Sequence, residues 1–219
     1  MGSEEIKVFA STRFELEVEA TALVVVDMQN EFLRQGGAVY VPGTGECIAN
    51  NQRLIQACRQ KGRPIFFTKY VTPPVPTLWR EFAGSLTEPP LQGLVKGRKR
   101  LFPDVGQELE VTEIIEELEV RDEDTVVEKS WYDSFWASPL GSYLRAVKAR
   151  DLIITGVVTE VCVEATVKAA YLRNFRTVVA ADAVASAEPE YHRVVLELLA
   201  RRWAMVLETK EIIDRLNRR

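Results

Sequence analysis

Cysteine and histidine are scarce in this chain of 219 residues, which holds three cysteines and one histidine. An odd number of cysteines without a CxxC pair argues against a disulfide framework and against a zinc ribbon. So few thiols, none of them in a pairing pattern, fit a reducing compartment. We therefore expect a cytoplasmic protein.

A dominant charge is also missing, since 28 lysines and arginines are interspersed with 32 aspartates and glutamates, for a net charge of -4. Such a chain has no long basic face for phosphate backbones or anionic lipids, and no apolar run approaches the length of a membrane span. The opening MGSEEIKVFA lacks the basic and apolar regions of a signal peptide. We expect no nucleic-acid partner, no membrane partner and a small molecule as the substrate.

Hydrophobic residues, in contrast, make up 47% of the chain, enough for the core of one domain over 1–219. Six short runs rich in β-branched residues alternate with segments of helical period, which is typical of an α/β fold. Because each run is nearly apolar throughout, we expect a six-stranded, mainly parallel sheet with helices on both faces. The runs are ALVVVD (22–27), PIFFTK (64–69), TVVEK (125–129), DLIITG (151–156), TVVAAD (177–182) and AMVLET (204–209). A proline-rich stretch at about 70–107 is too long for a simple connection and is expected to form a long loop or arm.

Three of these runs end in, or lead directly to, a side chain that can do chemistry. Asp27 ends the first run, Lys129 ends the third, and Cys162 follows the fourth by one tight turn. Ligands of open parallel sheets bind beyond the carboxyl ends of the strands. Taken singly, such residues are more often a helix cap, a surface cation and a small core residue. Together, a nucleophile, a carboxylate that can accept its proton and a cation that can hold both indicate nucleophilic catalysis.

The turn before Cys162 gives a second argument for a nucleophile. Gly156 permits an unusual backbone, and a segment of helical period runs from about Cys162 to Asn174. The free amides and the positive end of the macrodipole at a helix start lower a thiol pKa, and they can also stabilise an oxyanion. We therefore expect Cys162 to be largely thiolate near neutral pH, whereas Cys47 and Cys58 are expected to be packing residues.

The segments ALVVVDMQNEF, VVEKSWYDSF and LIITGVVTEVCVEATVKAA, followed by TVVAADAVAS, resemble the isochorismatase-like cysteine hydrolases. The resemblance extends over roughly residues 21–209, with the three motifs in the family's order. It implies a three-layer Rossmann-like fold with strand order 3-2-1-4-5-6. It also implies a catalytic triad of Asp27, Lys129 and Cys162.

The same resemblance implies a cis peptide bond between Val157 and Val158, and an oxyanion hole made by the amides of Val158 and Cys162. The implied activity is cysteine-dependent hydrolysis of a C–N bond in a small amide, carbamoyl or ureido compound through a thioester acyl-enzyme. A vinyl ether hydrolase of the isochorismatase type, which needs no thiol, and a catalytically silent assembly module remain alternatives. Cys162 favours the amidohydrolase branch.

Some nicotinamidases of this family bind a metal through an aspartate and histidines that follow the second strand. Here the residues after PIFFT read KYVTPP, and the only histidine, His192, lies in a late helical segment, where we expect it to pack or cap. We therefore expect no metal site and no cofactor.

Relatives place an aromatic wall close to the catalytic aspartate, and Phe32 stands five residues after Asp27. Tyr132 and Phe135, which follow Lys129, are further candidates for substrate binding, although aromatics near strand ends are more often core residues. The arm at 70–107 carries many apolar side chains, so we expect it to contact another subunit. Because relatives are commonly dimers or tetramers, a homodimer or homotetramer is expected.

Overall fold

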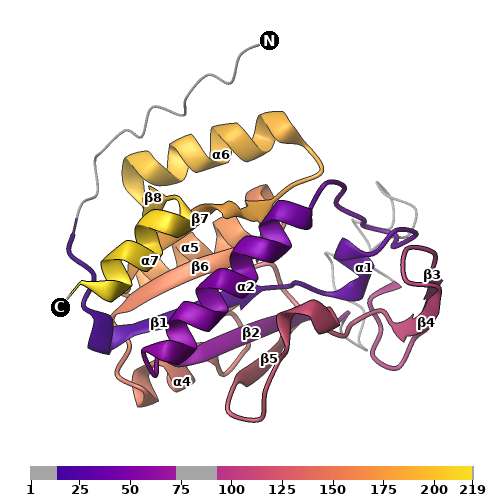
Figure 1. Cartoon of the computed structure of the whole chain (residues 1–219), viewed down its shortest axis with the longest axis horizontal. Helices are drawn as coiled ribbons and strands as arrows, with labels where there is room; N and C mark the ends of the chain where they lie inside the picture. Colours follow the sequence, from indigo (N-terminus) through magenta and orange to yellow (C-terminus); the bar gives the residue numbers. More distant parts are fainter. Residues whose placement is uncertain (1–13, 73–92, 219) are drawn as a thin grey trace.

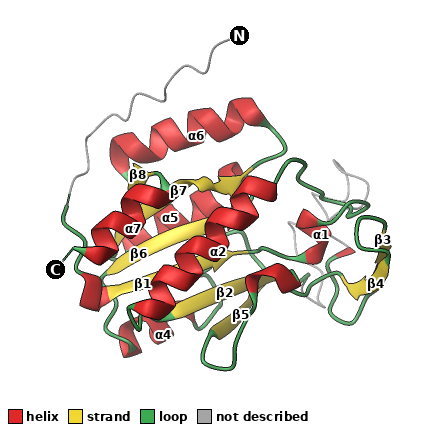
Figure 2. Ribbon diagram, viewed as in Figure 1, coloured by secondary structure: helices red, strands yellow, loops and turns green. Residues whose placement is uncertain are grey.

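A parallel sheet of six strands organises this protein, whose structure is a computed structural model that describes residues 14–72 and 93–218. Every pairing in this sheet is parallel. The spatial order is β5-β2-β1-β6-β7-β8 (Figure 2). When only the strands of this sheet are numbered along the chain, the order is 3-2-1-4-5-6, as expected. The strands are β1 (Thr21–Val26), β2 (Ile65–Tyr70), β5 (Thr125–Lys129), β6 (Asp151–Val157), β7 (Arg176–Ala185) and β8 (Met205–Leu207).

Helices cover both faces of the sheet and complete the three layers (Figure 1). One face packs against α2 (Gly45–Gln60) and α7 (Thr209–Asn217), and the other against α4 (Leu140–Ala146), α5 (Glu164–Leu172) and α6 (Pro189–Arg202). The shorter elements are the 3-10 turns η1 (Val18–Ala20) and η3 (Glu116–Leu118), α1 (Asn30–Leu33) and the π-helix η4 (Thr159–Val163). Within the described residues, no helix is long and apolar enough to cross a membrane.

The central strands are apolar on both sides, which is why they lie in the middle of the sheet. All residues of β1 and β6 are buried. Leu23 and Val25 of β1 contribute to the core under α2, whereas Val24 and Val26 contribute to the core under α5 and α6. From β1 the chain builds β2 and β5 on one side and then returns to build β6 on the other. The strand order therefore reverses beside the carboxyl ends of β1 and β6, where such folds place their ligands.

The proline-rich stretch at 70–107, which we expected to form a long loop or arm, contains a hairpin in its described part. Residues 73–92 lie outside the described residues, but β3 (Lys99–Phe102) and β4 (Gln107–Glu110) form an antiparallel hairpin. Arg100 of β3 donates to both carboxylate oxygens of Glu31, at 2.9 and 3.1 Å, and the Glu31 side chain is fully buried. This ion pair fixes the hairpin to α1, directly beyond the end of β1.

Candidate active site

Asp27 is the first residue beyond β1, and its carboxylate is held from two sides. Its backbone has a φ of 51°, in the left-handed region, and its amide donates to the Thr68 carbonyl at 3.2 Å. The Thr68 hydroxyl donates to Asp27 Oδ1 at 2.7 Å. Because β1 and β2 pair in parallel with Val26 opposite Thr68, this bond follows directly from the sheet register. The side chain of Asp27 is fully buried.

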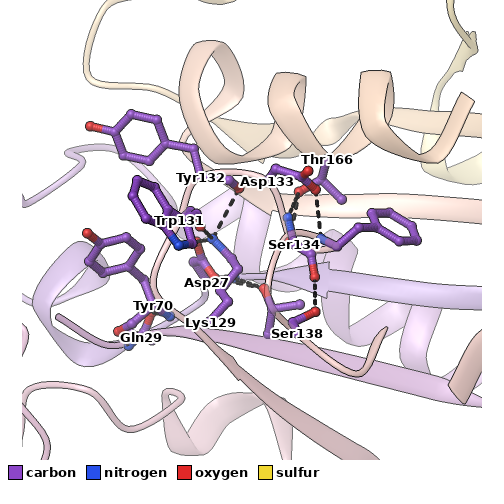
Figure 3. Close-up of polar contacts among 12 residues, drawn as sticks. Asp27, Gln29, Tyr70, Lys129, Trp131, Tyr132, Asp133, Ser134, Ser138 and Thr166 are labelled. Carbon is purple, nitrogen blue, oxygen red and sulfur yellow. Dashed lines mark hydrogen bonds and ion pairs between the residues drawn. The ribbon is translucent and has the colours of Figure 1, made fainter. Parts of the chain in front are cut away.

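Lys129 ends β5, two strands away from β1, and reaches across β2 to Asp27. Its Nζ lies 2.7 Å from Asp27 Oδ2, and both side chains are fully buried. The same Nζ donates to the carbonyl oxygens of Trp131, at 2.9 Å, and Tyr132, at 3.2 Å (Figure 3). It also lies 5.5 Å from the centre of the Tyr70 ring. An ammonium group has three N–H donors, so these contacts fix Lys129 in one position.

The third side chain arrives through a tight junction between β6 and β1. Gly156 pairs with Val26 and has a φ of 108°, and a Cβ at this position would lie 2.0 Å from the Val26 carbonyl oxygen. Only glycine fits there. The following peptide bond, Val157–Val158, is cis, as the resemblance implied. The chain then enters η4, which carries Cys162 back toward Asp27.

Cys162 lies in the π-helix η4, where its side chain is in hydrogen-bonding reach of both Asp27 and Lys129. The residue is only 3% exposed. In η4 the first hydrogen bond between residues five apart runs from the Val163 amide to the Val158 carbonyl. The Cys162 amide precedes this bond and therefore belongs to the first turn of the helix, where amides lack partners within the helix. The structure therefore brings together all three residues that the strand ends indicated.

The expectation that Cys162 is largely thiolate at neutral pH is wrong for this site. Burial raises the pKa of the Cys162 thiol, and the nearby Asp27 carboxylate raises it further, whereas Lys129 opposes both effects. Burial outweighs the effect expected of the helix start, because the thiol is almost completely removed from water. The pKa values of Cys47 and Cys58 rise to about 12 for the same main reason.

Lys129 remains a cation in this setting. Burial acts to lower the pKa of Lys129, but Asp27 and then Cys162 outweigh burial, and the net shift is upward. The resting site thus consists of an ammonium–carboxylate pair beside a neutral thiol. In this arrangement the Asp27 carboxylate is a proton acceptor within hydrogen-bonding reach of the thiol.

Comparison with known proteins identifies the family of this chain. The family model of the isochorismatase domain matches residues 21–211. This chain belongs to the isochorismatase family. Over 181 residues, 78% of the chain and 73% of the relative, it is 34% identical to the ureidoacrylate amidohydrolase RutB of Pseudomonas syringae pv. syringae.

Solved structures of this family share the fold. A cysteine hydrolase from Pseudomonas syringae pv. phaseolicola superimposes with a TM-score of 0.82 at 26% identity, covering 93% of this chain and 95% of that one. The pyrazinamidase of Pyrococcus horikoshii, solved in complex with zinc, gives a TM-score of 0.72 at 26% identity, with 86% of this chain and 99% of that one covered. In residues 14–72 and 93–218, no group of three or more His, Cys, Asp or Glu side chains is placed to hold a metal ion.

The three aromatic candidates of this family member lie in different surroundings. Phe32 is 4% exposed in α1 and packs in the core on the α2 side. Tyr132 is half-buried, packs against both cores and lies 6.5 Å from the Tyr70 ring. Burial raises the pKa of Tyr132, and so does the negative charge that Cys162 carries when its thiol is ionised.

Phe135 has the contacts of a core residue. Its ring lies 5.8 Å from that of Phe175, and the Arg173 guanidinium lies 5.1 Å from its centre. These contacts account for its burial without a substrate. Of the three aromatic rings, Tyr132 has the structural position that best suits a substrate-binding role, and such a role stays a prediction for all three.

The sequence did not reveal the residues that position the triad in this isochorismatase-family chain. Thr68, which orients Asp27, was visible only as a polar residue inside an apolar strand run. Ser134 and Thr166 join the segment after Lys129 to α5 through hydroxyl groups 2.7 Å apart (Figure 3). His192 of α6 lies with Nδ1 2.9 Å from the hydroxyl of Thr159, the first residue of η4. His192 therefore packs against the helix of Cys162.

Proposed function

We propose that this chain hydrolyses a C–N bond of a small ureido, carbamoyl or amide compound through a covalent intermediate on Cys162. The observation that carries the proposal is the neutral thiol of Cys162, which lies in reach of the buried Asp27–Lys129 pair. The similarity to a ureidoacrylate amidohydrolase supports the ureido class of substrate. We propose the cytoplasm as its location, since all three thiols are free and buried.

Asp27 would act as the general base in the first half of the reaction. It takes the proton from Cys162 as the sulfur attacks the carbonyl carbon, and Lys129 stabilises the charges of both groups. The carbonyl oxygen becomes an oxyanion, which the amides of Val158 and Cys162 are proposed to bind. When the C–N bond breaks, Asp27 returns the proton to the nitrogen, which leaves as ammonia or an amine.

The second half removes the acyl or carbamoyl group from the sulfur. Water attacks the same carbonyl carbon and Asp27 accepts a proton from this water. The C–S bond then breaks and Asp27 passes the proton to the sulfur, which regenerates the Cys162 thiol. The sequence of steps uses one base twice, which suits a carboxylate whose position is fixed by Thr68 and Lys129. Substrate specificity would come from side chains around this centre, among which Tyr132 and Phe32 are the candidates.

The direct test measures release of ammonia and amine from a panel of small ureido, carbamoyl and amide compounds, including ureidoacrylate. We expect turnover of at least one ureido or carbamoyl compound, and its loss in Cys162→Ala. The matched control is Cys58→Ala, which removes another buried thiol on α2 and should keep turnover. Rapid acid quenching followed by intact-mass spectrometry should show an adduct on the peptide that contains Cys162.

Two other functions give different results in the same experiment. A vinyl ether hydrolase of the isochorismatase type would release pyruvate from isochorismate and would tolerate Cys162→Ala. A catalytically silent assembly module would turn over no compound of either class. Full ammonia release by Cys162→Ala would contradict the covalent mechanism. We expect turnover to survive dialysis against EDTA, since every proposed step is assigned to a side chain, a backbone amide or water.

A further inference from the structure

The two helix layers differ in how much apolar surface they leave exposed. The helices α2 and α7, both described in full, carry none of the exposed large hydrophobic side chains. The opposite layer, α4 to α6, exposes several of them, and they lie on each of its helices or directly after one. They are Tyr143, Val147, Tyr171, Leu172, Tyr191, Val194 and Leu198.

On α6 these side chains form one continuous stripe. Tyr191, Val194 and Leu198 are 57%, 45% and 41% exposed, and their spacing of three and four residues puts them on one side of the helix. The adjoining side of α6 is buried in the core, where Val195 and Leu199 pack. The apolar part of α6 is therefore wider than the part that the core covers. The uncovered stripe is a surface that suits a partner.

The charges at the ends of α6 indicate which partner fits. Glu188 is the N-cap residue and Glu190 lies in the first turn, whereas the last turn contains Arg201 and Arg202. All four residues are exposed. The helix thus has an acidic start, an apolar middle and a basic end. Such a pattern is complementary to itself when two copies of the helix lie antiparallel, and the two helix dipoles are then also opposed favourably.

We propose that the exposed apolar stripe of α6 pairs antiparallel with the same stripe of a second copy of this chain, around a two-fold axis near Val194. This register places Tyr191 beside the second copy's Leu198, twice, because a two-fold interface repeats each contact. Glu188 then lies near the second copy's Arg202, and the two residues are displaced along the helix axis by about the rise of one residue.

The neighbouring helix extends the apolar surface. Tyr171 of α5 packs edge-on against Trp203, directly after α6, with the ring centres 5.2 Å apart. Leu172 beside it is 73% exposed. The proposed pairing carries the start of the second copy's α6 toward these side chains. This association is independent of the proposed hydrolase activity, so either proposal can fail without the other.

Light scattering coupled to size-exclusion chromatography, at micromolar protein, provides the test. We expect the wild-type chain to be a dimer or a larger even assembly. Leu198→Glu should halve the mass of the particle, because it places two unpaired charges in the interface, and the dissociation constant should rise by at least about a hundredfold. The matched control is Leu101→Glu, since Leu101 is 64% exposed on the β3–β4 hairpin and outside the proposed interface.

Charge reversal tests the antiparallel register without removing apolar surface. Glu188→Arg should weaken association about fivefold, since two rim pairs are lost, and the double variant with Arg202→Glu should restore it. Circular dichroism confirms that each variant is folded. A monomeric wild-type chain, a Leu198→Glu variant of unchanged mass, or dissociation by Leu101→Glu instead would each overturn the proposal. Failure of the double variant to recover would overturn the antiparallel register.

Discussion

An aspartate pairs with a cation at the amino ends of the parallel strands and again at their carboxyl ends, called here the amino and carboxyl edges of the sheet. The two pairs are built differently. At the amino edge, Asp151 and Arg176 start the neighbouring strands β6 and β7. Both carboxylate oxygens of Asp151 accept from this guanidinium, at 2.5 and 2.7 Å, and Oδ2 also accepts from the Glu17 amide at 2.7 Å. The Arg176 side chain is 36% exposed. At the carboxyl edge, Asp27 and Lys129 are fully buried beside a thiol.

This difference separates a structural ion pair from one that is suited to chemistry. The guanidinium of Arg176 occupies both oxygens of Asp151, and solvent reaches this arginine. The Asp151 carboxylate therefore serves to join β6 to β7 and to the segment around Glu17. The compact ammonium of Lys129 contacts only Oδ2 of Asp27 and leaves the thiol of Cys162 in reach.

The largest effect is expected when the two aspartates are exchanged for asparagine. Asp27→Asn removes the proposed base for the thiol proton, so kcat should fall by at least about a thousandfold. Asp151→Asn removes the same charge from the opposite edge and should leave kcat unchanged. Steady-state ammonia release measures both.

Both variants are also expected to lower the free energy of unfolding. Asp151→Asn should lower the free energy of unfolding by about 1–3 kcal/mol, because bonds to a charged group are lost. Asp27→Asn leaves the Lys129 ammonium buried without its carboxylate, which costs about 3–5 kcal/mol. Activity is therefore compared at a temperature where urea titrations show both variants folded. Equal loss of kcat in the two variants would contradict a special role for the carboxyl edge.

A second experiment follows the reactivity of the Cys162 thiol by iodoacetamide labelling and peptide mapping. Asp27 raises the pKa of Cys162 and Lys129 lowers it. Asp27→Asn should therefore make labelling at pH 7 faster, by about tenfold, and Lys129→Met should make it slower, although both variants lose turnover. In the wild type the labelling rate should keep rising with pH above 9, since a raised pKa keeps the thiol protonated. Faster labelling in Lys129→Met would contradict the proposal that Lys129 lowers the pKa of Cys162.

A smaller effect is expected from the hydroxyl group that orients Asp27. Thr68→Val removes a hydrogen bond to a carboxylate in a buried site, so kcat should fall by about tenfold while the site keeps its charges. Thr21→Val is the control at the other end of β1, where the hydroxyl donates to the Glu17 carbonyl at 2.9 Å. A lower kcat in Thr21→Val than in Thr68→Val would show that general loosening of the sheet, and not the orientation of Asp27, limits turnover.

The smallest effect concerns the contact between α6 and the helix that carries Cys162. His192→Ala should lower kcat about threefold, and His192→Asn, which can place a polar atom near the position of Nδ1, should retain most of it. Thr159→Val combined with His192→Ala should be no worse than either single change, because both remove the same bond. Additive losses in the double variant would indicate two separate effects.

The strand runs could be predicted from sequence because their signal is local. The runs are nearly apolar, and the first and third of them end in a charged residue, so Asp27 and Lys129 were recognisable one run at a time. The common edge then follows from the rule that parallel strands end on the same side. Cys162 required the additional observation of a glycine junction before a helical segment. By contrast, the β3–β4 hairpin was missed because proline-rich surroundings hid two short strands that are fixed by the Glu31–Arg100 contact.

Which side chains reach the carboxyl ends of the strands can be read from short segments, because these show the alternation of strands and helices and the positions of Asp27, Lys129 and Cys162. The chemical state of the site follows instead from long-range packing. The protonation of Cys162 depends on how much water the packed helices exclude and on two charges brought there by strands far apart in the chain. These long-range contacts reverse the thiolate expectation, because desolvation of a buried group is a property of the whole fold and outweighs what one helix start can supply.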